Sequence, residues 1–329
     1  MSDLKQYKSF NESQIGETLI RPVLVSAINE STARNGKPYV RLTLKDGESE
    51  TVAAMFDTTA AALEEMGVIK DSVCDVELPV GEYQGAKNFK IGRISVCSDK
   101  GITAADFVRL PPVPLDKMYN EICEMLRSCA DDCGGRYTPL SELAADMIGH
   151  YKEKYMTSSA AVNMHHNIRG GLLYHSYRMT RAADALCRVY SILDRELMIC
   201  GTVLHDIGKL WEYNTTVAGD ADFTSAGIMF GHIYLGASLI KKFTEGKNYN
   251  MEKVQMLTHM ILSHHGTREW GAVVCPSTPE AFALHYIDNI DAKIYMCEDH
   301  FGQMEKGTIT DKKPFGLDNR LYKSKLFDE

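Results

Sequence analysis

The sequence predicts a chain of mixed α and β structure, with a small β-barrel of five strands followed by a larger all-helical domain. Two patterns predict this. Between residues 16 and 98, short apolar segments that partly alternate with polar residues are separated by turn signals. From Leu115 onward, apolar residues recur at helical spacing. The stiff segment Pro111-Pro112-Val113-Pro114 lies between the two patterns, and 329 residues suffice for two domains with a sizeable core.

The elements of the first part follow the order of a five-stranded OB-fold barrel, which has three strands, a helix and two more strands. Arg21–Ile28 partly alternates, and Tyr39–Gly47 is typical of a half-buried strand that ends in an Asp-Gly turn. We expect strands at residues 21–28, 39–47, 51–57, 72–80 and 88–96, and a helix at 58–66.

The second part is expected to be helical throughout. Pro139 stands at the first position of one helix, and Gly170-Gly171 breaks the chain before another. The expected helices cover residues 116–129, 139–156, 172–190, 193–208, 227–245, 251–264 and 279–296. The resulting organisation is an N-terminal lead at 1–15, the barrel at 16–98, a linker at 99–115, the helical domain at 116–305 and a C-terminal tail at 306–329. The basic, aromatic tail could fold back over a neighbouring surface.

Composition limits the function only weakly. A net charge of −8 argues mildly against electrostatic coating of nucleic acid, but a bound metal can supply the positive charge that a nuclease needs. No apolar run approaches the roughly 18 residues that would span a bilayer, so we expect no membrane partner. The nine cysteines are scattered, which favours reduced thiols in a cytoplasmic protein.

Histidines and carboxylates occur in five separated clusters of the helical part. The central cluster is Leu204–Lys209, in which an adjacent histidine and aspartate follow an apolar run. An imidazole beside a carboxylate is a good half-site for divalent Mn, Fe, Zn or Ni rather than Ca. The other clusters are Gly170–Ser176, Gly231–Ile233, Ser263–Gly266 and His285–Asp291. Because each lies in a predicted helical segment, their side chains could converge from several helices on one site.

These clusters predict a primary metal set with positions left open for water and a phosphoryl oxygen. The primary set consists of His175, His205, Asp206 and Asp288. A second metal could be held by His232, His264 and His265, although any of the three could instead bind the phosphate or protonate the leaving oxygen. The ion count is therefore one or two. The expected catalytic residues are Asp206, Lys209 and His232.

Several of these roles have plain structural alternatives. Lys209 could stabilise charge on a phosphate, or it could satisfy the carbonyls at a helix end. Asp288 and Asp291 compete for one ligand position because they are three residues apart and share a helix face. A substrate cleft could include His165, His166, Arg268 and Trp270, which could equally be ordinary loop residues.

The order H…HD…H…HH…D resembles the HD superfamily of metal-dependent phosphohydrolases. In that superfamily the position matching Asp288 is the ligand and the one matching Asp291 tends to be structural. Nearly the whole chain is similar to the YhaM-type 3′→5′ exoribonucleases of Gram-positive bacteria, through "NMHHNIRGGLLYHS", "LHDIGK", "GHIYLG", "ILSHHGTREWG" and "EAFALHYIDNIDAK". This resemblance implies a manganese-dependent enzyme that shortens single-stranded RNA from the 3′ end. Single-stranded DNA is a candidate for an additional substrate. The sequence does not exclude Fe, Ni, Co, Zn or Mg as the bound metal.

The segments "NGKPYVRLTLKD" and "GEYQGAKNFKIGRI" resemble nucleic-acid-binding OB folds. Aromatic residues of one face could stack bases while basic residues bind phosphates. The residues concerned are Lys37, Tyr39, Arg41, Phe56, Tyr83, Lys87, Phe89 and Lys90. The alternative is that about half of the aromatic residues fill the barrel core.

Two other functions are kept as alternatives. One is an HD phosphohydrolase that acts on a small or cyclic nucleotide, with the barrel serving assembly or regulation. The other is a single-strand-binding module on a catalytically silent HD scaffold, which the full set of ligands disfavours. The sequence leaves a homo-oligomer open.

Overall fold

The computed structural model describes residues 3–33, 35–129, 136–160, 168–216, 219, 221–302 and 304–326. The chain divides into two compact units. The first contains residues 1–110 and 215–220, and the second contains residues 111–214 and 221–329. Each unit has its own buried apolar core.

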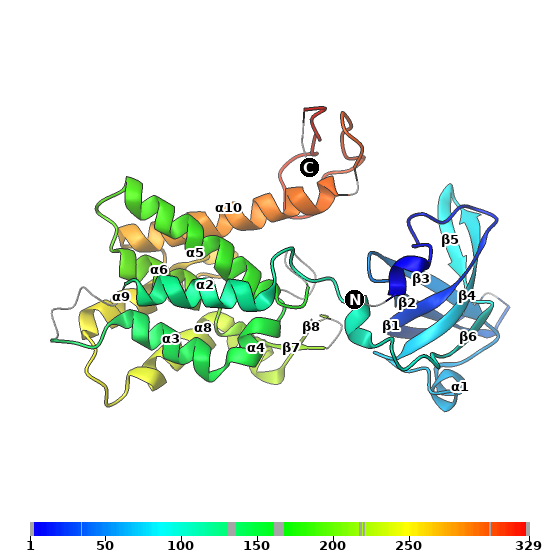
Figure 1. The fold of residues 1–329 in the computed structure, drawn as a ribbon, viewed down its shortest axis with the longest axis horizontal. Coiled ribbons are helices and arrows are strands. Elements are labelled where there is room, and N and C mark those ends of the chain that lie inside the picture. The colour runs from blue at the N-terminus through cyan, green and yellow to red at the C-terminus, as the bar shows by residue number, and fades with distance from the viewer. Residues whose placement is uncertain are drawn as a thin grey trace. The chain divides into compact units, whose positions relative to one another are not determined.

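The first unit is a closed β-barrel (Figure 1). Its elements are β1 (Thr18–Thr32), β2 (Pro38–Lys45), β3 (Glu50–Phe56), α1 (Ala60–Glu65), β4 (Val73–Tyr83), β5 (Ala86–Lys90) and β6 (Arg93–Val96). β1 pairs with both β2 and β4, β2 pairs with β3, and β5 closes the ring by pairing with β4 and, in parallel, with β3. The order of elements is that expected for an OB fold. The expected last strand at 88–96 is interrupted at Ile91-Gly92, so that its second half, β6, pairs with β4 alone.

Alternation along the strands decides which side chains fill this barrel. Val40, Leu42 and Leu44 on β2 are fully buried, whereas Tyr39 and Arg41 point to the other face. The N-terminal lead is tied to the barrel by Asp46, whose carboxylate accepts the Phe10 N–H at 2.7 Å. The first unit therefore offers one outer face of β2 and β3 on which polar and aromatic side chains stand together.

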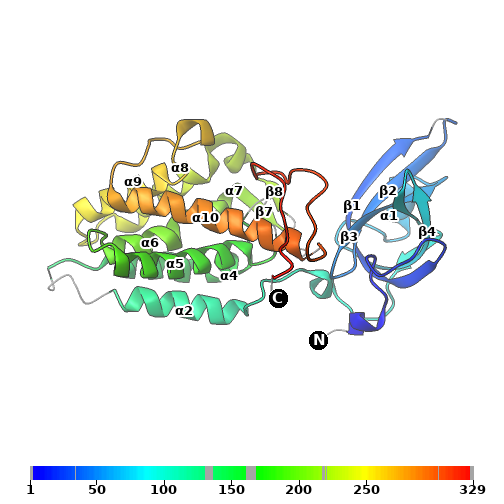
Figure 2. The ribbon, with the colours of Figure 1, turned by 90° about the horizontal axis from the view of Figure 1, so that it is seen from above.

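The second unit is a bundle of helices with a short hairpin (Figure 2). Its elements are α2 (Leu115–Arg127), α3 (Leu140–His150), α4 (Lys152–Thr157), α5 (Gly171–Val189), α6 (Arg195–Leu204), α7 (Lys209–Glu212), β7 (Tyr213–Thr215), β8 (Ala221–Phe223), α8 (Ser225–Thr244), α9 (Met251–Ser263) and α10 (Pro279–Phe301). The expected helix at 139–156 is divided at Tyr151, and the hairpin was not expected. No helix in the described part of the chain is long and apolar enough to cross a membrane.

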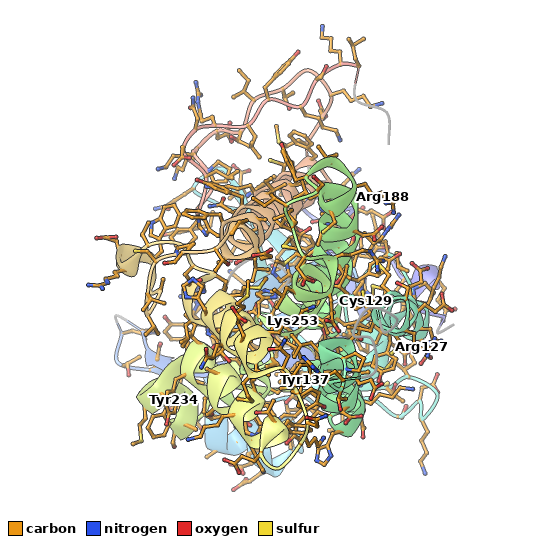
Figure 3. All side chains as sticks on the ribbon, turned by 90° about the vertical axis from the view of Figure 1, so that its left-hand side faces the viewer. Arg127, Cys129, Tyr137, Arg188, Tyr234 and Lys253 are labelled. Atoms are coloured by element: carbon orange, nitrogen blue, oxygen red, sulfur yellow. The ribbon has the colours of Figure 1, made fainter. Side chains whose placement is uncertain are left out.

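Helix α6 forms the centre of this bundle. It contacts α2, α3, α5, α9 and α10, and every residue from Glu196 to Leu204 is buried. Its N-terminus is fixed by Asp194, whose side chain accepts the Leu197 N–H, and by Lys253 of α9, labelled in Figure 3, whose ammonium lies 2.9 Å from Glu196. The C-terminus of α6 therefore delivers the next residues, His205 and Asp206, into the interior.

The C-terminal tail packs on α10 (Figure 1). Residues 308–310 pair with 321–323. Lys323 is 4% exposed, and its ammonium donates to the carbonyls of Phe301 and Met304 at the end of α10. Lys293 of α10 donates to the Gly316 carbonyl at 2.8 Å. The tail thus covers one side of α10 near its C-terminal end.

Candidate metal centre

Three side chains from α5, the end of α6 and α10 form the first group of potential ligands. His175 Nε2 lies 3.1 Å from Asp288 Oδ1 and 3.3 Å from His205 Nε2. One ligand atom from each residue lies within 4.8 Å of the others. Two imidazole nitrogens that face each other at this distance need a proton or a cation between them. The group therefore has the donor set and spacing of a metal site.

A second group adjoins the first. His232 of α8 and the adjacent pair His264 and His265, which follows α9, also bring one ligand atom each within 4.8 Å of one another. Asp206 reaches both groups: its Oδ2 lies 3.2 Å from His205 Nε2, and its Oδ1 lies 3.4 Å from His232 Nε2. Asp206 could therefore contribute a carboxylate oxygen to each of the two ligand groups.

Unpaired buried atoms test whether a cation fits here. Among the described residues, Asp206 Oδ1, His232 Nε2 and His264 Nε2 are buried without a hydrogen-bond partner. Leaving such a group unpaired costs about 1–3 kcal/mol. All three atoms face one point, since His264 Nε2 is 3.8 Å from Asp206 Oδ1. A borderline divalent cation would satisfy imidazole and carboxylate donors together, so the residues fit the metal.

The other ring nitrogen is held by a hydrogen bond in His175, His205, His264 and His265. Carbonyl and carboxylate oxygens only accept hydrogen bonds, so each holds the ring N–H on Nδ1 and leaves Nε2 for a ligand. The hydrogen-bond partners of Nδ1 are Asp291 for His175, the Thr202 carbonyl for His205, the Ile261 carbonyl for His264 and the Trp270 carbonyl for His265. Glu212 Oε2 lies 2.9 Å from His232 Nδ1 but has no hydrogen-bond partner among the described residues. Asp291 therefore lies behind His175, and Asp288 lies in front of it.

The charges of the side chains in the two ligand groups favour the binding of a cation between them. Burial would raise the pKa of Asp206, but the Lys209 ammonium at 2.7 Å and the neighbouring histidines outweigh it and hold the pKa well below its usual range. Burial would lower the pKa of His175, but Asp288 and Asp291 outweigh it and raise the pKa to about 10. In contrast, burial holds the pKa of His264 well below its ordinary value, so this ring is neutral.

The clusters open into a cavity of about 550 Å³. Trp270 stands at its edge with 61% of its surface exposed, and Gly316 of the tail contributes to its wall. The cavity is lined by Ala160, His175, Asp206, Lys209, Tyr213, His232, His264, His265, Trp270, His285, Asp288, Asn289, Ala292, Lys293, Met296 and Gly316. Arg268 is exposed in the short 3-10 helix Arg268–Trp270. The predicted cleft residues His165 and His166 lie outside the described residues.

Five residues of the expected nucleic-acid face lie near one another on the barrel. The ring of Tyr39 stacks on that of Phe56, with centroids 5.5 Å apart and planes at 24°. Arg41 and Lys90 stand on either side of Ala54, each paired directly with it across the strands. Lys37 is close by and pairs with Asp57 at 2.8 Å.

The other three residues of that set are placed differently. Phe89 is 5% exposed and packs on Phe10 inside the barrel, because β5 turns this side chain to the core. Lys87 donates to the Asn11 carbonyl at 2.8 Å and so holds the N-terminal lead. Tyr83 is 65% exposed in the hairpin between β4 and β5. We therefore leave Phe89 out of the proposed nucleic-acid face.

Some residues of the site had no sequence signal. Glu212 occurs in no motif, and Lys293 ends the segment "EAFALHYIDNIDAK" without any role being indicated for it. A single carboxylate or ammonium beside an apolar run is usually solvent-exposed. His285 belongs to the cluster before Asp288, but only the fold brings its Nδ1 to the His264 carbonyl at 2.8 Å. The spacing of Asp291 placed it on the right helix face without indicating its partner, His175.

Comparison with known proteins agrees with this architecture. Residues 172–293 match the HD domain family, which implies divalent-metal binding. The barrel shares 15% identity with the second OB-fold domain of replication protein A from Methanococcus maripaludis, covering 28% of this chain and 96% of that one, with a TM-score of 0.23. The match to a putative aspartyl-tRNA synthetase from Leishmania major covers 35% of this chain and 30% of the synthetase chain. The sequence identity is 13% and the TM-score is 0.20. At such scores, the OB assignment rests on the strand pairing instead.

The molecule is thus an OB-type barrel joined to a helical HD domain of the metal-dependent hydrolase class. Over 315 residues it is 30% identical to the 3′-5′ exoribonuclease YhaM of Geobacillus sp. (strain WCH70), an alignment that covers 95% of this chain and 94% of the relative. The chain belongs to the YhaM family.

Proposed function

We propose that this protein is a metal-dependent 3′→5′ exoribonuclease that hydrolyses the phosphodiester bonds of single-stranded RNA, with single-stranded DNA as a second substrate. One observation carries the proposal: Asp206 lies 3.2 Å from His205 of one ligand group and 3.4 Å from His232 of the other, in a chain that aligns nearly end to end with YhaM. We further propose a cytoplasmic location, which agrees with free thiols at all eight described cysteines. Whether it forms a homo-oligomer stays open.

We assign the ligands by group. His175, His205, Asp206 and Asp288 would hold one ion, and His232, His264 and His265 would hold another with Asp206 shared. We propose Mn²⁺, the metal that the resemblance to the YhaM-type exoribonucleases implies. The donor set of imidazole and carboxylate accepts Fe, Co, Ni or Zn as well. Bound divalent ions supply a water of lowered pKa and polarise the scissile phosphate.

The remaining side chains of the cavity would bind the substrate. The Lys209 ammonium, 2.7 Å from Asp206, would stabilise negative charge that develops on the phosphate. Trp270, exposed at the edge of the cavity, would stack on the terminal base. The HD domain would thus bind the 3′-terminal nucleotide, and the barrel would bind the strand farther upstream.

The first test is incubation of the purified protein with Mn²⁺ and a 5′-labelled single-stranded RNA, beside a sample with EDTA. We expect a ladder of products that shortens from the 3′ end and is absent with EDTA. Intact RNA together with hydrolysis of mononucleotides or cyclic dinucleotides would overturn the proposal. The cavity of about 550 Å³ would then serve a small nucleotide.

The proposed barrel face gives a second prediction. Replacing both Tyr39 and Phe56 with alanine is expected to raise KM for a long RNA roughly tenfold or more, since stacking contributes about 1–3 kcal/mol per base. Hydrolysis of a dinucleotide, which the HD cavity alone would bind, should not change. Steady-state kinetics on both substrates measure this.

The matched control is Ile20→Ala, which removes a side chain 73% exposed on β1 of the same barrel. We expect it to leave both KM values unchanged. Equal KM values for the Tyr39 and Phe56 double variant and the wild type on long RNA would remove this face from the proposal.

A further inference from the structure

The tip of the C-terminal tail forms part of the wall of the metal-site cavity. Gly316 lines this cavity together with Lys293 and Met296 of α10. Lys293 donates to the Gly316 carbonyl at 2.8 Å, and a Cβ on Gly316 would lie only 3.0 Å from the Met296 sulfur. The tail, which stands beside the C-terminal end of α10 in Figure 1, therefore reaches the site itself.

A tight turn at residues 314–317 shapes this tip. The Leu317 N–H donates to the Pro314 carbonyl at 3.3 Å, and Gly316 has φ 79°. Phe315 does not share the positive φ, so the four residues have the form of a type II turn, in which the third position favours glycine. Phe315 therefore occupies the outer corner of a defined turn.

The turn holds one aromatic ring outward between two buried residues. Pro314 and Leu317 are buried, whereas Phe315 between them is 80% exposed. A single exposed apolar side chain is common on protein surfaces and means little alone. Here, however, the two buried neighbours and the hydrogen bond from Lys293 fix the backbone that carries the ring. The ring is therefore presented at a fixed place next to the cavity wall.

Positive charge accompanies the ring. Lys312 and Lys313 directly precede the turn and are exposed, and Lys293 places a third ammonium against it. The carboxylates on either side, Asp311 and Asp318, are exposed as well, and Asp318 lies 3.8 Å from the Lys293 ammonium. Exposed ion pairs contribute little to stability, so a phosphate can replace Asp318 at small cost. In a chain of net charge −8, this segment is locally suited to an anion.

The cavity has room only for the end of a nucleic-acid strand. A volume of about 550 Å³ is typical of a site for one small ligand, so the rest of a bound strand has to leave across the rim. Proteins that hold single strands without sequence preference combine aromatic rings, which stack on any base, with cations on the phosphates. Phe315 and the lysines before it offer this combination beside the cavity wall.

We propose that residues 312–317 of the tail bind the nucleotides just upstream of the cavity, with Phe315 stacked on a base and Lys312 and Lys313 on phosphates. Lys293 acts as the clamp that holds the turn against α10. The proposal rests on the single-stranded RNA substrate of the proposed function. It assigns part of the binding of that strand to the helical unit, in addition to the barrel.

The first test is the affinity for a short 5′-fluorescein-labelled single-stranded RNA, measured by fluorescence anisotropy with EDTA present so that the RNA stays intact. Phe315→Ala is expected to raise Kd about tenfold, since stacking contributes about 1–3 kcal/mol per base. Replacing both Lys312 and Lys313 with alanine should reduce the slope of log Kd against log salt by about 1.4, which is about 0.7 for each phosphate contact.

The matched control is Tyr190→Ala, which removes an aromatic side chain 55% exposed at the C-terminal end of α5. We expect it to bind RNA as the wild type does. Because Phe315 is 80% exposed, its replacement should leave the fold intact, which circular dichroism would check. A Phe315→Ala protein with wild-type Kd would overturn the proposal.

Photo-cross-linking tests the same surface in the unaltered protein. RNAs with 4-thiouridine at successive positions from the 3′ end are irradiated on the protein with EDTA, and the cross-linked residues are identified by mass spectrometry. We expect cross-links to residues 312–317 from a position near the 3′ end, and their absence at every position would overturn the proposal. Neither measurement depends on catalysis. A protein that cross-links through the tail but leaves RNA intact with Mn²⁺ would support this surface and overturn the exoribonuclease function instead.

Discussion

Replacing Asp206 with alanine is expected to lower kcat/KM for RNA by at least about 1,000-fold, the scale of loss when a unit of cooperating catalytic groups is broken. The carboxylate lies 3.2 Å from His205 Nε2 and 3.4 Å from His232 Nε2, so that its removal takes a ligand from both groups. It also leaves the Lys209 ammonium without its partner at 2.7 Å.

Rate and metal content should fall together. We would measure RNA hydrolysis by product ladders and bound Mn²⁺ by elemental analysis after gel filtration, expecting less than one ion per chain. Asp116→Ala, an exposed aspartate in the first turn of α2, is the matched control and should behave as the wild type. An Asp206→Ala enzyme that keeps a tenth of wild-type activity would show that the chemistry lies elsewhere.

Replacing Gly208 with alanine is expected to destabilise the protein by about 3 kcal/mol, the upper end of the cost of overpacking a buried site. Gly208 has φ −64° and ψ −20°, which any residue adopts, so backbone freedom does not explain the glycine. A Cβ there would lie 1.9 Å from the His232 carbonyl oxygen and 2.7 Å from the Gly236 nitrogen. Both are backbone atoms of α8, so the whole helix would have to move away.

Urea unfolding at equilibrium measures this change. Gly149→Ala in α3 is the matched control, because its Cβ would meet only the Tyr119 hydroxyl, at 3.9 Å. This change should be neutral or stabilise the protein by up to about 1 kcal/mol, as alanine does in a helix interior. Equal stability of the Gly208→Ala and Gly149→Ala proteins would show that α7 and α8 are not packed this closely.

Elements with a sustained pattern could be predicted from the sequence. The order of strands and helix in the barrel follows from apolar alternation and turn residues, and the long helices follow from their apolar spacing. Breaks and short elements could not be predicted. The strands β7 and β8 have three residues each, too few to repeat a pattern. The break at Ile91-Gly92 lies within a segment that alternates polar and apolar residues, and Gly92 alone was too weak a signal to predict it.

The sequence by itself determined the chemistry available to this protein, because the types and order of the histidines and carboxylates are specific and carry the family resemblance. Only the tertiary structure decided how they are used. His175 and Asp291 are 116 residues apart, and nothing local tells which nitrogen of the ring faces Asp291 and which faces Asp288. The Glu212 contact, the inward position of Phe89 and the need for glycine at 208 likewise depend on elements distant in the sequence. A local pattern fixes which face of an element is apolar, but helix packing and strand register fix what that face meets.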